Sequence, residues 1–240
     1  MRRQLALMVV LATVLIMVLK ANGVAPLRTV GVNVGDWSHY VFIYQGNSTA
    51  MDVGMDVNMT SGLFTVLSVS GTNVTLEMHG YYANGSDTIE VHWIDVDTGE
   101  NDGNATGMLI GANLMQGDLV YTTQVQPFME GTINATINRN YLGSPVEVNH
   151  FVTNMTAPPN GFYNVTLQMD WYWFRATGIP AEMTVSYADE SFLTGNNTWF
   201  SWSMTVDDIV PEFPATLVAP VFIMATLATV VVYKKRKKSG

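Results

Sequence analysis

The chain has 240 residues and no cysteine, which excludes disulfides, a thiolate nucleophile and a Cys-ligated zinc site. All twenty Asp and Glu lie between Asp36 and Glu212, whereas residues 21–233 contain only three basic residues, all Arg, so that stretch carries a net charge of −17. A body this acidic repels phosphate, which argues against nucleic-acid binding. The other eight basic residues flank two apolar segments, a pattern typical of an exported body between cytoplasmic ends.

Residues 1–23 are predicted to be a signal peptide. Two arginines precede a fifteen-residue apolar run at 5–19, which is shorter than the roughly 20 residues that a membrane-spanning helix needs. Small residues favour cleavage after Gly23, so that the mature protein would begin at Val24. Because Lys20 lies close to this cleavage site, an uncleaved anchor is the alternative.

The body, residues 24–210, is predicted to be an all-β extracellular domain. It holds all six Trp, and its length is sufficient for a sizeable core. Apolar and polar residues alternate with a period of two, as in 74–79 and 165–170, which indicates half-buried antiparallel strands. Turn-forming clusters at 46–48, 70–73, 84–87, 143–145, 158–161 and 195–197 separate these strands. A two-sheet sandwich and a curved half-barrel both fit this pattern.

The body also contains a faint internal repeat of about eighty residues, with units at 29–106 and 111–190. Gly35-Asp36-Trp37 has a counterpart in Gly117-Asp118-Leu119, and Thr98-Gly99 has one in Thr177-Gly178. Chance recurrence of such short turns in a β-protein explains the same observations. Two related halves are therefore one interpretation of the body.

The C-terminal segment predicts a membrane anchor. Residues 215–233 are apolar and, as a helix, would span about 28 Å, enough for the hydrocarbon layer. The basic tail 234–240 follows directly and is expected in the cytoplasm. The expected location is the cell membrane, with one span, the body outside and the C-terminus inside before any processing.

Pro211-Glu212-Phe213-Pro214, followed by one apolar helix and a basic end, resembles the PEF-CTERM sorting signal of archaeal surface proteins. The resemblance implies that an archaeosortase reads Pro211, Glu212 and Phe213, removes the helix and transfers the protein to a lipid. A plain membrane anchor behind a proline-stiffened linker is the alternative. Two stretches of the body, 30–37 and 173–179, also resemble uncharacterised archaeal secreted proteins, which implies a family but no activity.

Asn-x-Ser/Thr occurs nine times, whereas roughly three occurrences are expected by chance. All nine lie in the body, and several are beside turn-forming residues, where a glycan would point into water. The excess predicts an N-glycosylated surface and a partnership with glycosylation machinery. The predicted sites are Asn47, Asn58, Asn73, Asn84, Asn104, Asn134, Asn154, Asn164 and Asn196.

Two groups of residues are candidate metal sites. Glu77, His79, Glu90 and His92 would share one face of a hairpin if its turn were Asn84-Gly85 or Gly85-Ser86, and could ligate zinc. Cross-strand charge pairs on an exposed face are the simpler explanation. Asp95, Asp97 and Asp102 lie in a glycine-containing loop suited to weak calcium binding, but the loop departs from the EF-hand pattern, and a plain acidic hairpin loop also fits. No cofactor is expected otherwise.

The sequence contains no nucleophile elbow, zinc-protease motif, phosphate loop or dinucleotide fingerprint. We therefore expect a surface protein with a structural or binding role and no identifiable catalysis. A carbohydrate-active hydrolase that uses paired carboxylates such as Asp170 and Glu182 is the main alternative. A metal- or solute-binding surface protein is the third interpretation.

Overall fold

The computed structural model describes residues 28–47, 58–103, 105–123, 129–157, 163–191 and 197–210. The predicted signal peptide, the 211–214 motif, the predicted membrane helix and the basic tail lie outside the described residues. Within the described ranges, no helix has the length and apolar character needed to cross a membrane.

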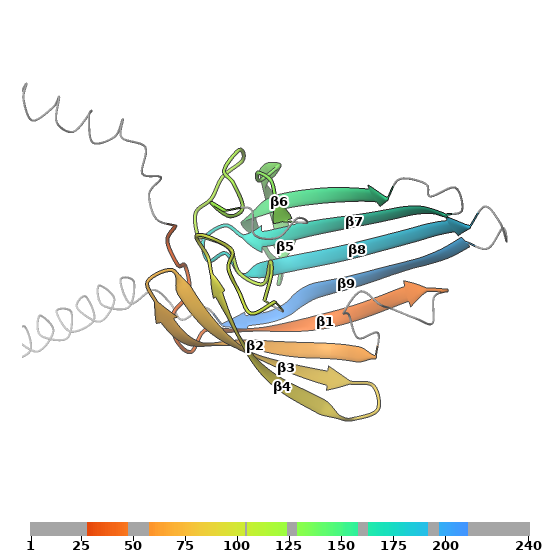
Figure 1. The fold of residues 1–240 in the computed structure, drawn as a ribbon. Coiled ribbons are helices and arrows are strands. Elements are labelled where there is room, and N and C mark those ends of the chain that lie inside the picture. Colours follow the sequence, from red (N-terminus) through yellow and green to blue (C-terminus); the bar gives the residue numbers. More distant parts are fainter. Residues whose placement is uncertain are drawn as a thin grey trace, which may run out of the picture.

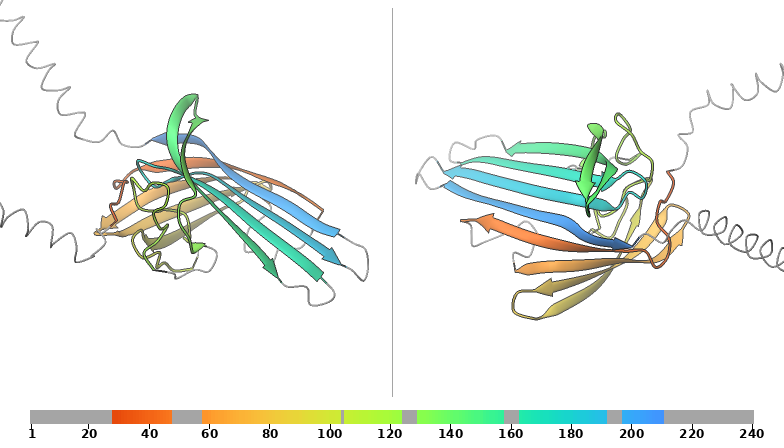
Figure 2. Two further views of the ribbon diagram at one scale, coloured as in Figure 1. Left: turned by 90° about the horizontal axis from the view of Figure 1, so that it is seen from above. Right: turned by 180° about the vertical axis from the view of Figure 1, so that it is seen from behind.

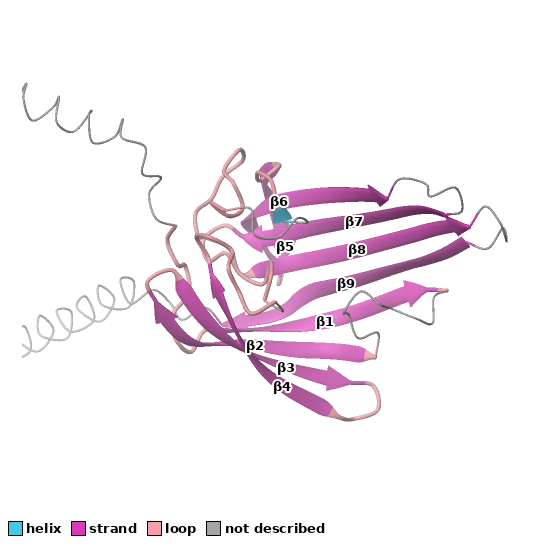
Figure 3. Ribbon diagram, in the orientation of Figure 1, coloured by secondary structure: helices cyan, strands magenta, loops and turns pink. Residues whose placement is uncertain are grey.

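The described residues form an all-β fold, as predicted (Figure 1, Figure 3). The predicted turns at Gly71, Gly85 and Gly143 fall between consecutive strands, and each glycine has a positive φ. The strands are β1 (Trp37–Gly46), β2 (Met59–Ser70), β3 (Asn73–Tyr82), β4 (Asp87–Asp95), β5 (Ala135–Tyr141), β6 (Ser144–Ala157), β7 (Tyr163–Phe174), β8 (Pro180–Ser191) and β9 (Asn197–Val210).

The nine described strands form one antiparallel sheet in the order β4-β3-β2-β1-β9-β8-β7-β6-β5. Two meanders, β1 to β4 and β5 to β9, are joined where β1 pairs with β9. Trp37 at the start of β1 is paired with Val210 at the end of β9, so the body begins and ends at the same end of the sheet. Figure 2 shows that the sheet is strongly twisted and curved, with one core on its concave face.

Irregularities in strand pairing account for the curvature. The register shifts once between β1 and β9, twice between β2 and β3 and once between β7 and β8, with the extra residue in β9, β2 and β8 respectively, and such bulges bend a strand and increase its twist. Gly62 and Gly80 are paired across β2 and β3, and a Cβ on Gly62 would lie 3.0 Å from the Phe42 ring. The missing side chain of Gly62 therefore lets the concave side close around Phe42, and that of Gly80 makes room for Met59.

The connection between β4 and β5, residues 96–134, is long and irregular, and we call it the plug segment. Trp173 Nε1 donates a hydrogen bond to the Gly107 carbonyl at 2.8 Å, and Tyr121 donates to the Leu109 carbonyl at 2.9 Å. The first bond holds the segment against the concave face, near the end where the body begins and ends, and the second bond lies within the segment (Figure 1). It adds the buried apolar residues Val96, Ala105, Leu109, Ile110, Ala112, Leu114, Val120, Tyr121, Met129 and Ile133.

The landmarks of the predicted repeat have matching local structure. The side chains of Asp36 and Asp118 each accept a hydrogen bond from the backbone N–H three residues earlier, at 2.7 and 2.8 Å. The loops 95–100 and 174–179 also share one pattern, in which the first N–H bonds the carbonyl five residues later. After the second loop the chain continues as β8, whereas after the first it makes only a bridge at Asn101 and continues through the rest of the plug segment. The repeat of the whole units remains a prediction.

Candidate functional site

Apolar side chains line the concave face in rows that cross the sheet, because directly paired residues of antiparallel strands share a face. The registers of β1, β9, β8, β7 and β6 define three such rows. The first contains Phe42, Met204, Met183, Trp171 and Phe151; the second contains Tyr44, Trp202, Val185, Met169 and Thr153; the third contains Phe200, Tyr187, Leu167 and Met155.

The first row is the most completely buried of the three, and the plug segment packs against it. A Cβ on Gly107 would lie 2.7 Å from the Trp171 ring, so the segment backbone lies directly against this indole. Every residue of the first row is buried. In the second and third rows Val185, Trp202 and Phe200 are also buried, whereas Met169 and Leu167 are half-buried and Met155 is exposed. The concave face thus passes from a closed core beside the plug segment to a partly accessible apolar surface.

The accessible part is a groove with a volume of about 720 Å³, within the roughly 300–1,000 Å³ range of small-molecule sites. Its floor comes from β7, β8 and β9, and its opposite wall comes from β2, β3 and β4. Gly103, Thr106 and Met108 of the plug segment also line it. Its lining extends to Met155 and Thr88, toward the ends of the strands farthest from Val210.

Methionine is the most frequent residue of the groove lining. Thioether side chains are flexible and polarisable, so they adapt to ligands of irregular shape. Aromatic rings of Phe42, Phe64, Trp171 and Trp202 provide large contact areas between them. The groove therefore suits an apolar ligand more than a polar one. The lining methionines are Met59, Met78, Met108, Met155, Met169, Met183 and Met204.

One polar group in the groove lining lacks a partner. Trp171 is 3% exposed, and its Nε1 has no hydrogen-bond acceptor among the described residues. The neighbouring Trp173 stacks on it at 5.3 Å between ring centroids and does donate its Nε1 proton, to Gly107. A buried donor left unpaired costs about 1–3 kcal/mol. A ligand oxygen that reached this N–H would recover that free energy.

His92 joins the edge strand β4 to the plug segment beside the groove. Its Nδ1 lies 2.9 Å from Asp102 Oδ2, and its Nε2 lies 2.9 Å from Glu90 Oε2. Burial disfavours the imidazolium, but the hydrogen bonds and charges of Glu90 and Asp102 outweigh burial and raise the pKa of His92. Protonated His92 donates to both carboxylates and thereby fastens the plug to β4.

The structure does not bring the four residues of the predicted zinc patch together. The β3–β4 turn has three residues between Tyr82 and Ser86, so His79 is paired with Ile89 and neither predicted register occurs. Compared with the predicted two-residue turn, the third turn residue shifts the register. It places Glu77 and His79 on the outer face, and His92 and Glu90 on the concave face. On the outer face His79 bonds Asp87 at 2.7 Å.

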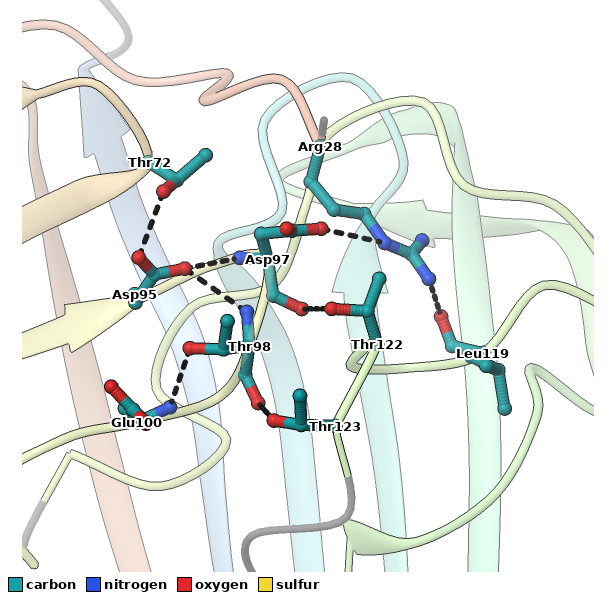
Figure 4. A network of polar contacts seen from close by, with 9 residues as sticks. All are labelled: Arg28, Thr72, Asp95, Asp97, Thr98, Glu100, Leu119, Thr122 and Thr123. Atoms are coloured by element: carbon teal, nitrogen blue, oxygen red, sulfur yellow. Dashed lines mark hydrogen bonds and ion pairs between the residues drawn. The ribbon is translucent and has the colours of Figure 1, made fainter. Parts of the chain in front are cut away.

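The three carboxylates of the predicted calcium loop also have separate partners. Asp95 accepts hydrogen bonds from Thr72 and from the Asp97 and Thr98 N–H groups (Figure 4). Burial opposes ionisation, but these bonds prevail and lower the pKa of Asp95. Asp97 lies 3.9 Å from Arg28, and Asp102 contacts His92. Within the described ranges, no group of three His, Asp or Glu residues is arranged to hold a metal ion.

The carboxylates of the hydrolase alternative lie on the outer face of β7 and β8. Asp170 is 3.1 Å from His150 Nε2. Glu182 accepts a hydrogen bond from Tyr141 at 2.9 Å and lies 3.1 Å from Arg139. These contacts hold β5 and β6 against β7 and β8, which explains both carboxylates without catalysis.

Six of the nine predicted glycosylation sites are exposed asparagines, on strands and turns of both meanders. At Asn84 the side-chain oxygen accepts from the Ser86 N–H, which leaves the amide nitrogen directed elsewhere for a glycan. Glycosylation itself remains a prediction. The exposed sites are Asn47, Asn58, Asn73, Asn84, Asn134 and Asn154; Asn104, Asn196 and the side chain of Asn164 lie outside the described residues.

Sequence reasoning missed the groove, although part of its signal was visible. The alternation at 165–170 correctly placed Leu167 and Met169 on the inner face. The alternation could not show how far the plug segment covers that face. No protein-family model and no curated protein sequence matches this chain.

Proposed function

We propose that this chain is a membrane-anchored, N-glycosylated protein of an archaeal cell surface, and that its extracellular body binds an apolar chain in the concave groove. The observation that carries the binding role is the groove itself: about 720 Å³ with a lining dominated by methionine and aromatic side chains.

The rows of the concave face argue for a ligand rather than a purely structural role. A core that served only stability would bury every side chain of the second and third rows, as it buries Val185, Trp202 and Phe200. Instead Met169, Leu167 and Tyr187 remain half-buried. Burying an apolar chain against them yields about 0.8 kcal/mol for each CH₂ group removed from water.

The shape and chemistry of the groove favour one linear apolar chain with an oxygen along it. Its floor crosses three neighbouring strands, and its flexible methionines can follow a bent chain. The Trp171 N–H is buried without an acceptor, so a side-chain shift that opened it to the groove would give a donor for a carbonyl, ether or hydroxyl oxygen. Glu90 on the wall disfavours an anionic head group nearby, because like charges repel.

The proposed cellular location rests on the charge distribution and on the sequons. The acidic body lies between apolar segments with basic flanks, and the 211–214 motif resembles an archaeal sorting signal. Exposure of six sequon asparagines supports glycosylation, because a glycan there requires no rearrangement of the core. No catalytic step is assigned to this protein.

Photo-crosslinking of the full chain in lipid nanodiscs tests the binding role. The probe is a long-chain alcohol with a diazirine on the chain, delivered from solution, and peptide mapping locates the label. We expect labelled residues on the concave side of β7, β8 and β9, and competition by the unlabelled alcohol.

Two neighbouring substitutions on β7 provide the matched comparison. Met169→Glu puts a carboxylate into the groove and should reduce labelling about tenfold, because burying an unpaired charge is costly. Gln168→Glu changes the outer face of the same strand and should leave labelling unchanged. Equal labelling of both variants with preserved circular dichroism, or label spread over the outer face, would refute the groove as the binding site. If Met169→Glu does not fold, Leu167→Ser replaces it.

A further inference from the structure

The body begins and ends at one end of the sheet, and this end is closely linked to the predicted membrane segment. Trp37 is paired with Val210, so β1 begins and β9 ends here (Figure 2). Only residues 211–214 separate Val210 from the apolar run 215–233. Five Cα-to-Cα steps reach at most about 18 Å, so the end of β9 must lie close to that run.

Exposed apolar side chains from three separate segments are found at this end. Val34 is 56% exposed and lies three residues before Trp37. Leu142 is 49% exposed in the β5–β6 turn and shares a shallow hollow with Ile209 of β9. Leu119 is 43% exposed, and its carbonyl accepts a hydrogen bond from Arg28 (Figure 4). We call Val34, Leu119 and Leu142 the anchor-side face.

The only arginines of the body are at this same end, and the body has no lysine. Arg28 contacts Leu119 and lies 3.9 Å from Asp97. Arg175 follows the last residue of β7 and pairs with Glu147 at 2.6 Å. Arg139 is on β5 near Leu142. Each arginine is paired with a carboxylate, so their charges offset part of the acidity of this end, which also holds Asp207 and Asp208. The remainder of the body has acidic residues without Lys or Arg.

We infer that the anchor-side face rests on the surface of a lipid bilayer. Apolar side chains there insert at the level of the head groups, and the arginines reduce the repulsion that an acidic protein meets at a membrane with anionic lipids. This inference rests on the membrane anchor of the proposed function. It adds an orientation and a second partner surface, the bilayer itself, to that function.

The orientation decides from which side the ligand reaches the groove. The groove lining extends away from Val210, toward Met155 on β6 and Thr88 on β4. The fourteen residues of β9 span about 46 Å at 3.3 Å per residue. The far end of the groove is therefore directed away from the bilayer beneath the protein, and its apolar ligand arrives from the outside, in solution or on a carrier.

The absence of cysteine makes the orientation directly measurable, because each introduced cysteine is the only one in the chain. Full-chain Leu142→Cys and Leu119→Cys report the anchor-side face, and Ser86→Cys in the exposed β3–β4 turn reports the opposite end. Each variant carries an environment-sensitive fluorophore and is reconstituted in phosphatidylcholine and phosphatidylglycerol vesicles that contain a lipid with a nitroxide head group. We expect quenching at positions 142 and 119 to be several-fold stronger than at position 86.

Three results would overturn the inference, and they differ from one another. Equal quenching at positions 86 and 142 in protein that stays with the vesicles rejects the orientation alone. Release of the protein from the vesicles by an alkaline wash rejects the membrane anchor. It also rejects the cell-surface location in the proposed function. Efficient disulfide formation between two unlabelled Leu142→Cys chains, together with loss of quenching in the labelled protein, shows that this face binds protein. Photo-crosslinking in the groove is independent of all three.

Discussion

The two faces of β7 are built from alternate residues of one strand, but different forces organise them. On the concave side Trp171 and Trp173 are buried against the plug segment. On the outer side Asp170 pairs with His150, and Tyr172 lies 4.1 Å below the Arg139 guanidinium. Burial of apolar area dominates the stabilisation of the concave face. The outer face is organised by partly exposed charged pairs worth about 0–1 kcal/mol each. The concave face should therefore control stability and binding.

Two tryptophans test this difference most strongly. Trp173 is fully buried on the concave face, and Trp199 is 47% exposed on the outer face of β9. Trp173→Ala should lower the free energy of unfolding by about 3–5 kcal/mol, because it removes a large core side chain and leaves a cavity. Trp199→Ala should change it by about 0.5 kcal/mol. Urea unfolding of the full chain in detergent, followed by circular dichroism, measures both; similar losses would contradict the comparison.

Two glycines of the plug segment test how closely it covers the concave face. Gly107 has φ +77° and no room for a Cβ beside Trp171, whereas Gly117 has φ +91° and nothing within 4 Å of that position. Gly117→Ala should cost only the left-handed backbone strain, about 1–2 kcal/mol. Gly107→Ala should cost about 1–3 kcal/mol more, because the methyl group displaces the plug from the indole. Thermal melts compare the two variants. If their melting temperatures agree, the plug is not tightly seated.

The smallest expected effect is the pH dependence of the link between the plug and β4. The pKa of His92 is raised in the folded protein, so its contribution is fully present below the unfolded pKa of about 6.5 and is lost as pH rises through the folded pKa. Glu90 and Asp102 are the charged groups in contact with the ring. His92→Gln should remove this part of the pH dependence, and Asp102→Asn should weaken it. Superimposable stability-against-pH curves for wild type and His92→Gln would count against the link.

Much of the candidate site could be predicted one strand at a time. The alternation of 74–79 correctly assigned Val74 and Leu76 to the buried face, and the turn clusters marked the strand boundaries. The zinc patch failed for a specific reason. Asn84-Gly85-Ser86 fits several turns, and the observed three-residue turn moves His79 to the face opposite His92. Alternation within a strand is local, but the register between strands depends on one residue in the turn.

The sequence by itself determined the strands, their inward faces and the separation of charge, because these depend on residue type and on the period of two. It also contains the sequon asparagines and the two apolar flanking segments, on which the expected cellular location rests. The tertiary structure decided that β1 pairs with β9, that residues 96–134 cover only part of the concave face, and that seven methionines from distant segments line one groove. Such arrangements follow from packing between segments far apart in the chain, where contacts are set by curvature and volume rather than by any local pattern.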